Sequence, residues 1–307
     1  MKVIDLRPRG YCHGVLNALA IVKKVVKDSN YPRPIYVLGQ IVHNQKITEA
    51  FQAYSVISLN QKDKTRLEML NDIKEGTVIF TAHGVSDNVI AAAKKKKLTT
   101  LNATCRDVLT VHKAIKQKLA EGYKILYIGH NNHPEPEAIL DIDPSIIFLK
   151  NTQDVEDLPN SLNEKKLFVT NQTTLSMYDI NPILKALSNR FEYVFDNEIC
   201  QATTLRQTAV IKQEKVDLML VIGDKKSSNS NKLVAVGALQ SINSHLIGGI
   251  EDINLDWLKN IDSVSVTSGA STPTTVTEEV IAFLRQYKQN DPNTWDTKSK
   301  LTPIDIL

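Results

Sequence analysis

Several features that mark other classes of protein are missing from this 307-residue sequence. No segment approaches the roughly 18 consecutive apolar residues of a membrane-spanning helix. The first ten residues, MKVIDLRPRG, lack the apolar region of a secretion signal. The 37 basic and 34 acidic residues leave a net charge of only +3, which gives no reason to expect nucleic acid as a partner. We therefore expect a cytoplasmic protein that binds neither membrane nor nucleic acid.

Cysteine is scarce and is never paired locally. The sequence has three cysteines, Cys12, Cys105 and Cys200, and no CxxC motif. An odd number of thiols in a chain without a secretion signal argues against a disulfide framework and for a reducing compartment. The GxxxxGK[ST] motif is also absent, which excludes a P-loop. The hydrophobic content of 42% and charged content of 23% are those of an ordinary globular protein.

The three cysteines mark an internal repeat. They are separated by 93 and 95 positions, and each stands between a strand-like run and a helical pattern. An apolar run that ends in glycine follows each of them, and these runs end at Gly39, Gly129 and Gly223. Two further strand-like runs complete every repeat. Equal spacing of the cysteines alone could arise by chance, but the matching glycines and strands make the repeat convincing.

The alternation of strands and helices predicts an α/β protein with parallel sheets. We expect three similar α/β lobes in a pseudo-threefold arrangement, with one cysteine from each at the centre. The strand before each cysteine should complete the preceding lobe, so the strand in 1–13 belongs to the third. The predicted boundaries are 14–104, 105–197 and 198–286, followed by a C-terminal extension, 287–307, that packs on another lobe or stays mobile.

Polar residues follow the apolar strands at matching positions, where ligands bind in parallel α/β sheets. Four residues after the three glycines come His43, His133 and Ser227, and Ser228 and Asn229 follow the last of these. After the last strand of each repeat we place His83, Thr173 and Ser271 in a common register. These side chains are mostly neutral hydrogen-bond donors, which suit a phosphate or diphosphate. Singly, each is more often a structural residue.

Three thiols at helix starts predict a metal centre, because a helix N-terminus favours the thiolate that a metal requires. Structural zinc sites normally use four protein ligands, as iron–sulfur clusters do. Three cysteines on a 4Fe–4S cluster would leave one iron open to bind substrate as a Lewis acid.

The stretch GHNNHPEPE adds two carboxylates. Glu135 should face the predicted cavity and deliver protons, whereas Glu137 should start the following helix. Thr173 could relay a proton or orient a substrate hydroxyl.

The motifs as a set resemble the IspH (LytB) family of 4-hydroxy-3-methylbut-2-enyl diphosphate reductases. They occur in family order over most of the chain and read RGYCHGV, TAHGVS, NATC, GHNNHPE, NQTTLS, CQATTLRQ, SSNSNKL and TSGASTP. The resemblance implies one 4Fe–4S cluster on Cys12, Cys105 and Cys200, with the fourth iron open to substrate. It also implies that Glu135 and Thr173 are catalytic. The implied substrate-binding residues are His43, His83, His133, Thr173, Ser227, Ser228, Asn229 and Ser271.

The implied reaction is the two-electron reductive dehydroxylation of (E)-4-hydroxy-3-methylbut-2-enyl diphosphate. It gives isopentenyl and dimethylallyl diphosphates and ends the non-mevalonate isoprenoid pathway. The electrons would come singly from a donor protein such as ferredoxin or flavodoxin. The chain departs from the family pattern at Arg106 and Asp107, where proline commonly follows the cysteine.

Three other functions fit parts of the pattern. The nearest is a three-lobed enzyme of the quinolinate synthase type, which handles carboxylates rather than an allylic diphosphate. A non-catalytic iron–sulfur sensor would not need Glu135 and Thr173. A zinc-stabilised phosphate-binding protein comes last, and metal analysis would identify it.

Overall fold

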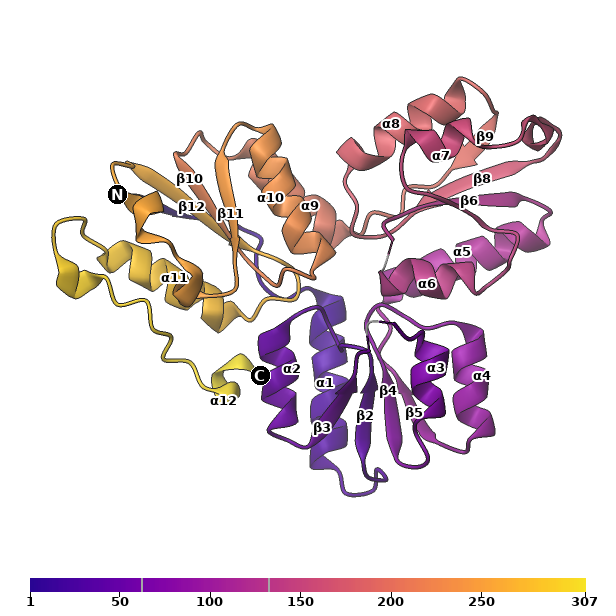
Figure 1. Ribbon diagram of the computed structural model, residues 1–307, viewed down its shortest axis with the longest axis horizontal. Coiled ribbons are helices and arrows are strands. Elements are labelled where there is room, and N and C mark those ends of the chain that lie inside the picture. Colours follow the sequence, from indigo (N-terminus) through magenta and orange to yellow (C-terminus); the bar gives the residue numbers. More distant parts are fainter. Residues whose placement is uncertain (62, 132) are drawn as a thin grey trace. The chain divides into compact units, whose positions relative to one another are not determined.

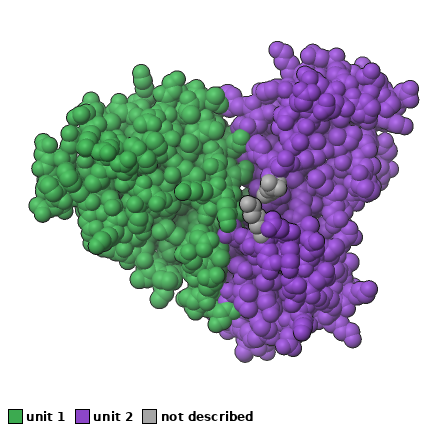
Figure 2. Space-filling view, viewed as in Figure 1, with its two compact units in different colours: residues 1–16, 42–55, 201–307 green, residues 17–41, 56–200 purple. Residues whose placement is uncertain are grey.

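The computed structural model describes residues 1–61, 63–131 and 133–307. Asn132, in the GHNNHPE motif, lies outside the described residues. The chain forms two compact units (Figure 2), which we describe separately. Unit 1 comprises residues 1–16, 42–55 and 201–307, and unit 2 comprises residues 17–41 and 56–200. Among the described residues, no helix is long and apolar enough to cross a membrane.

Unit 1 contains one parallel sheet (Figure 1), with strands in the order β11-β10-β12-β1. The strands are β1 (Lys2–Asp5), β10 (Leu218–Ile222), β11 (Asn243–Ile247) and β12 (Ser263–Ser268). The main helices are α2 (Gln45–Gln52), α9 (Gln201–Lys212), α10 (Ser228–Leu239) and α11 (Thr274–Gln286). Strand β1 pairs with β12 from Lys2 opposite Ser263 to Asp5 opposite Val266. This confirms that the N-terminal strand completes the last sheet.

Unit 2 contains two parallel sheets, with strands in the orders β3-β2-β4-β5 and β7-β6-β8-β9. The first has β2 (Ile35–Leu38), β3 (Val56–Leu59), β4 (Thr77–Phe80) and β5 (Thr99–Asn102). The second has β6 (Lys124–Ile128), β7 (Ile147–Leu149), β8 (Leu167–Asn171) and β9 (Tyr193–Phe195). The helices are α3 (Arg66–Asn71), α4 (Asp87–Lys95), α5 (Arg106–Ala120), α6 (Pro134–Leu140), α7 (Thr152–Glu156) and α8 (Met177–Ser188). Helix α1 (His13–Lys27) follows Cys12.

All three sheets have the same strand order when each is counted from its own first strand. The strand before each cysteine (β5, β9 and β1) lies at the edge of the sheet that precedes that cysteine in the repeat. In each sheet one of the two central strands (β4, β8 and β10) is buried along its whole length, because helices cover both faces of the sheet. The predicted α/β repeat with three parallel sheets is therefore confirmed.

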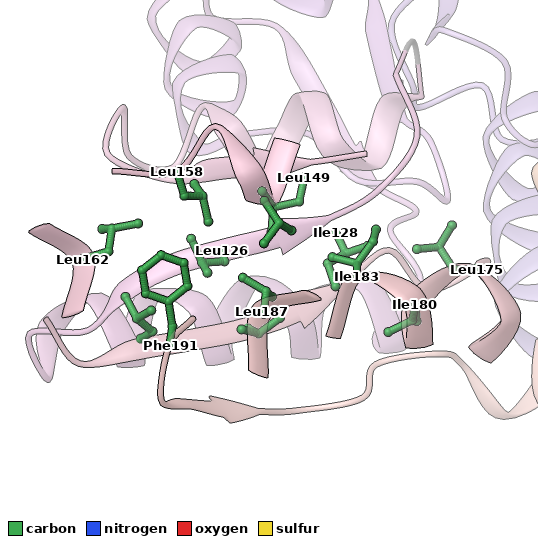
Figure 3. Close-up of a cluster of buried hydrophobic side chains, with 13 residues drawn as sticks. Leu126, Ile128, Leu149, Leu158, Leu162, Leu175, Ile180, Ile183, Leu187 and Phe191 are labelled. Carbon is green, nitrogen blue, oxygen red and sulfur yellow. The ribbon is translucent and has the colours of Figure 1, made fainter. Parts of the chain in front are cut away.

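A hydrophobic cluster in unit 2 shows how one face of a sheet is covered (Figure 3). Ile180, Ile183 and Leu187 recur at helical spacing on α8 and pack against Leu126 and Ile128 of β6. Helices α5 and α6 contribute to a second cluster that also includes residues of β6. The sheet is thus enclosed on both faces, and its carboxyl edge is where polar residues gather.

The C-terminal extension packs on unit 1. Its short helix α12 (Pro303–Ile306) lies against α2 (Figure 1). The hydroxyl of Tyr11 donates to the carbonyl of Ile306 at 3.0 Å, and Thr275 Oγ1 donates to the Asp305 carbonyl at 2.8 Å. The extension is thereby held by hydrogen bonds to the N-terminal segment and to α11.

Two glycines make room for Ser230 at the start of α10. A Cβ built on Gly269 would collide with Ser230 Oγ but would lie 3.2 Å from its Cβ. A Cβ on Gly223 would collide with the same oxygen and would also lie 2.6 Å from the Cβ. Ser230 is fully buried and donates to Ser227 Oγ at 3.0 Å, so it has little room to move.

We therefore expect Gly269→Ala to lower the free energy of unfolding by about 2–3 kcal/mol through overpacking. Ser230→Ala alone should cost about 1 kcal/mol for the lost hydrogen bond. In the Gly269→Ala background, Ser230→Ala should instead restore stability. Gly223→Ala is the matched control, because its clash with the Cβ remains when the hydroxyl is removed. Urea unfolding of all five variants measures the coupling. If the losses in unfolding free energy of Gly269→Ala and Ser230→Ala simply added in the double variant, the result would contradict this packing.

Candidate active site

The three cysteines occupy the same backbone position in their repeats. Each directly precedes a helix (α1, α5 or α9), and each is half-buried. Each cysteine N–H donates to the carbonyl of the second residue after the end of the third strand in a sheet. The acceptors are Ala270 for Cys12, Ala82 for Cys105 and Thr173 for Cys200, at 3.1, 3.0 and 3.0 Å. The same backbone hydrogen bond thus occurs in all three repeats, and in each it places a cysteine beside the end of a strand.

The chemistry of these donors fits an iron–sulfur cluster. Thiolates are the usual protein ligands of such clusters, and a helix N-terminus favours the thiolate. The sequence has no fourth cysteine and no short-range pair of the kind that structural zinc sites use. An iron–sulfur cluster in which one iron has no protein ligand therefore suits the three cysteines better than a structural zinc site, which needs four protein ligands.

In unit 1, Asn229 links α10 to the loop that holds Cys12. Its Oδ1 accepts the N–H of Ala270 at 2.9 Å, and its Nδ2 donates to Thr203 Oγ1 at 3.2 Å. The carbonyl of the same Ala270 accepts the N–H of Cys12. Ser227 is the N-cap of α10, and its hydroxyl accepts the N–H of Ser230 at 3.3 Å. Ser228 begins the helix and is half-buried.

Unit 1 also brings His43 and Ser271 together. Ser271 Oγ donates to the carbonyl of His43 at 2.9 Å. The equal spacing from glycine predicts similar places for His43, His133 and Ser227, but the helix starts differ. His133 and Ser227 are N-caps, whereas α2 begins one residue later with Asn44 as its N-cap. The Asn44 side chain accepts the N–H of Ile47 at 3.2 Å, which explains the later start.

In unit 2, His83 and His133 lie together. Their rings meet edge to face with centroids 5.5 Å apart and planes at 85°. His133 Nδ1 accepts the N–H of Glu135 at 3.2 Å, so the imidazole caps α6. His130 contributes its backbone N–H to Gln172 Oε1 at 3.0 Å. Two of the histidines expected to bind substrate are thus adjacent, one from the segment after β4 and the other at the N-cap of α6.

The carboxyl of Glu135 is the most buried acidic group of the candidate site. The residue is 1% exposed. Thr173 donates to it twice, from its N–H to Oε1 at 2.8 Å and from Oγ1 to Oε2 at 2.9 Å. The Tyr127 hydroxyl donates to Oε1 at 3.4 Å. Burial raises the pKa of Glu135 to about 7, although the hydrogen bonds from Thr173 and Tyr127 oppose the shift. Glu135 can therefore hold or release a proton near neutral pH.

The register of Thr173 differs from the one expected. The N–H of Gln172 bonds to the carbonyl of Ile128 as the N–H of Gly269 bonds to that of Ile222. Thr173 consequently matches Ala270 and Ala82, one residue before Ser271 and His83. The common register expected for Thr173, Ser271 and His83 is therefore wrong by one residue, because the segments between the strands differ in length among the repeats. In this register Thr173 donates two hydrogen bonds to Glu135, and its carbonyl accepts the N–H of Cys200.

Two partners of this site could not be found from the sequence. Arg66, at the start of α3, donates its N–H to Glu137 Oε1 at 2.9 Å and forms an ion pair with the same carboxylate. Glu137 lies in the first turn of α6, which begins earlier than expected, at Pro134. Tyr127 reaches Glu135 from inside β6. Arg66 is 71 positions from Glu137 and carries no local motif.

Comparison with known proteins identifies the family. The family model described as LytB protein matches residues 3–285. The chain belongs to the LytB family. It is 46% identical to the 4-hydroxy-3-methylbut-2-enyl diphosphate reductase of Bacillus velezensis, over 100% of this chain and 98% of that protein. The identity to the enzyme of the same name from Geobacillus thermodenitrificans is 47%, over 100% and 97%.

Two solved structures of LytB-family reductases resemble the chain. The reductase of Plasmodium falciparum superposes with a TM-score of 0.85 at 35% identity, covering 96% of this chain and 90% of that one. A second, described as the terminal enzyme of the non-mevalonate pathway, has a TM-score of 0.66 at 29% identity and covers 94% and 100%. The family implies an iron–sulfur cluster and a 4-hydroxy-3-methylbut-2-enyl diphosphate substrate.

The raised pKa of Glu135 predicts a pH-dependent stability. Because Glu135 binds its proton more tightly in the folded state, at a pKa of about 7 against an ordinary value of 4.5, stability falls as pH rises through this window. The loss at pH 8 should be on the order of 3 kcal/mol relative to pH 4. Glu135→Gln should remove it. Urea unfolding at pH 5, 6, 7 and 8 measures the difference between the two proteins.

Thr173→Val provides the internal control for this prediction. It removes the hydroxyl that stabilises the ionised carboxyl, so the window should move to higher pH. A stability difference between wild type and Glu135→Gln that does not vary with pH would show that Glu135 is already ionised at pH 5.

Proposed function

We propose that the chain reduces (E)-4-hydroxy-3-methylbut-2-enyl diphosphate to isopentenyl and dimethylallyl diphosphates, as the last step of the non-mevalonate pathway. The observation that carries the proposal is the continuous network from Tyr127 through Glu135 to Thr173, whose carbonyl holds Cys200. It joins a carboxyl whose pKa is raised to about 7 to the backbone N–H of one of the cysteines. The reaction consumes two electrons and two protons, breaks one C–O bond and releases water.

We assign the cluster to Cys12, Cys105 and Cys200, which share one backbone arrangement. When bound, a 4Fe–4S cluster supplies electrons one at a time and a Lewis-acidic iron. The protein must supply the proton that makes hydroxide a better leaving group. When Glu135 is protonated on Oε2, its 2.9 Å hydrogen bond with Thr173 Oγ1 reverses direction. The carboxyl can then pass its proton to the threonine, while the threonine gives its own proton to the substrate oxygen.

The diphosphate would be held by neutral donors. In unit 1, Ser227 Oγ accepts from Ser230 Oγ, so its own proton remains for a phosphate oxygen. Asn229 uses one amide N–H on Thr203, which leaves the second. Ser271 would have to turn from the carbonyl of His43 to donate. The full proposed set is His43, His83, His133, Thr173, Ser227, Ser228, Asn229 and Ser271.

Neutral donors recognise the diphosphate by hydrogen bonds but do not neutralise its negative charge. The buried Glu135 would be disfavoured in its ionised form beside that charge, which helps it stay protonated until transfer. Substrate binding and proton supply are therefore coupled by electrostatics. This coupling also favours a site from which water is excluded.

Glu135→Gln should lower turnover by about 10²–10⁴-fold, the usual contribution of a positioned general acid. The dissociation constant of the substrate should change less than about threefold, because the amide keeps the shape of the side chain. Turnover with a chemical reductant and isothermal titration give the two numbers. Glu156→Gln changes an exposed carboxylate of the same unit and serves as the control. Equal loss of binding and turnover would count against proton delivery.

Replacing Cys12, Cys105 or Cys200 by serine should abolish or cripple cluster binding in each case. Electron paramagnetic resonance of anaerobically prepared, reduced protein should show a 4Fe–4S signal that changes when the substrate is added. Iron and sulfide analysis of the three variants should show less than about one intact cluster in ten chains. A variant that keeps full iron and activity would remove that cysteine from the cluster.

A further inference from the structure

A cavity of about 510 Å³ in unit 2 lies outside the residues assigned to catalysis and substrate binding. It opens between helices α4 and α5 and includes residues of the segment that joins β5 to α5. Apolar side chains of both helices and basic side chains of α5 line it. Those that matter here are Asp87, Ile90, Leu109, His112, Lys113 and Lys116.

The exposed side of α5 next to this cavity is apolar and basic. Arg106, Leu109, Lys113 and Lys116 are exposed and recur at intervals of three and four residues, which places them on one helix face. Leu109 is 43% exposed, and Ile90 of α4 is 37% exposed. We call Ile90, Arg106, Leu109, Lys113 and Lys116 the α4–α5 face. Apolar residues bordered by charges are the usual composition of a protein interface.

The charge on this face is only partly compensated. Asp87, the acidic residue that lines the cavity, forms an ion pair with Lys116. In the part of the chain that the structure describes, Arg106 and Lys113 have no ion-pair partner. His112 is 7% exposed, and burial lowers its pKa to about 4, so it adds no charge at neutral pH. A partner with carboxylates around an apolar centre would complement such a face.

The face also begins at a cysteine. Cys105 is the N-cap of α5, and its carbonyl accepts the N–H of Leu109 at 3.0 Å. At 1.5 Å per residue, Leu109 lies about 6 Å and Lys113 about 12 Å from Cys105 along the helix axis. A protein docked on Leu109 would therefore stand one helical turn from a thiol assigned to the cluster.

We propose that the α4–α5 face is the docking site of a small acidic ferredoxin that supplies the electrons. The proposal rests on the proposed reductase function. Two reduced ferredoxins dock in turn, and each is oxidised by one electron. The two electrons and two protons reduce one substrate molecule, so one C–O bond breaks, one C–H bond forms, and water leaves.

The test reverses two charges on residues that are assigned neither to substrate binding nor to the cluster. Arg106→Glu/Lys113→Glu should raise the dissociation constant for oxidised ferredoxin at least tenfold in isothermal titration at low salt. It should also flatten the salt dependence of binding. Lys165→Glu/Lys185→Glu, on exposed positions elsewhere in unit 2, makes the same change in net charge and should leave binding within about twofold.

Turnover then separates docking from chemistry. With reduced ferredoxin, the Arg106→Glu/Lys113→Glu variant should lose at least tenfold in rate, whereas reduced methyl viologen should drive it as it drives the wild type. Leu109→Gln should weaken ferredoxin binding without a change in net charge. Unaltered ferredoxin binding, or an equal loss in the control pair, would overturn the docking site. Wild-type protein inactive with methyl viologen would instead overturn the reductase function.

Discussion

The hydrogen bond from each cysteine N–H to the carbonyl beyond a strand end is the constraint on which the rest of the site depends. It ties the start of a helix to the third strand of a sheet, so that a thiol and the polar residues after that strand share one edge. A parallel sheet offers this edge because the carboxyl ends of its strands lie together. Because the chain contains three such sheets, the same hydrogen bond occurs three times, with one cysteine in each.

Much of this arrangement could be predicted from spacing. The pairing of β1 with the last sheet and the position of each cysteine before a helix follow from periodicity and from glycine at the strand ends. The register of Thr173 and the start of α2 could not be predicted. The register of Thr173 depends on the lengths of the connecting segments, and the start of α2 depends on the N-cap at Asn44. Counting residues along the sequence accounts for neither. Arg66 and Tyr127 reach the site only through tertiary packing, and the sequence gives no local sign of either.

The repeats also explain where the chemistry comes from. Asn229 and Glu135 stand six residues after Gly223 and Gly129, and each accepts the N–H of the residue that anchors a cysteine. The interaction is the same, but the acceptor is an amide in one repeat and a carboxyl in the other. In the remaining repeat, where α2 starts one residue later, the residue six positions after Gly39 is Gln45, and the N–H of Ala82 bonds to the carbonyl of Ile41 instead.

The group that accepts this hydrogen bond is therefore an ionisable carboxyl in one repeat only. An amide at this place can fix the loop but has no proton to release near neutral pH. A carboxyl can do both, provided that burial keeps its pKa near 7. The residue that anchors the cysteine differs in the same repeat, since Thr173 stands where alanine is found at 82 and 270 and adds a hydroxyl that donates to Glu135 Oε2. Two side-chain differences at equivalent positions of a structural repeat thus place a buried carboxyl of raised pKa beside a hydroxyl in one repeat only.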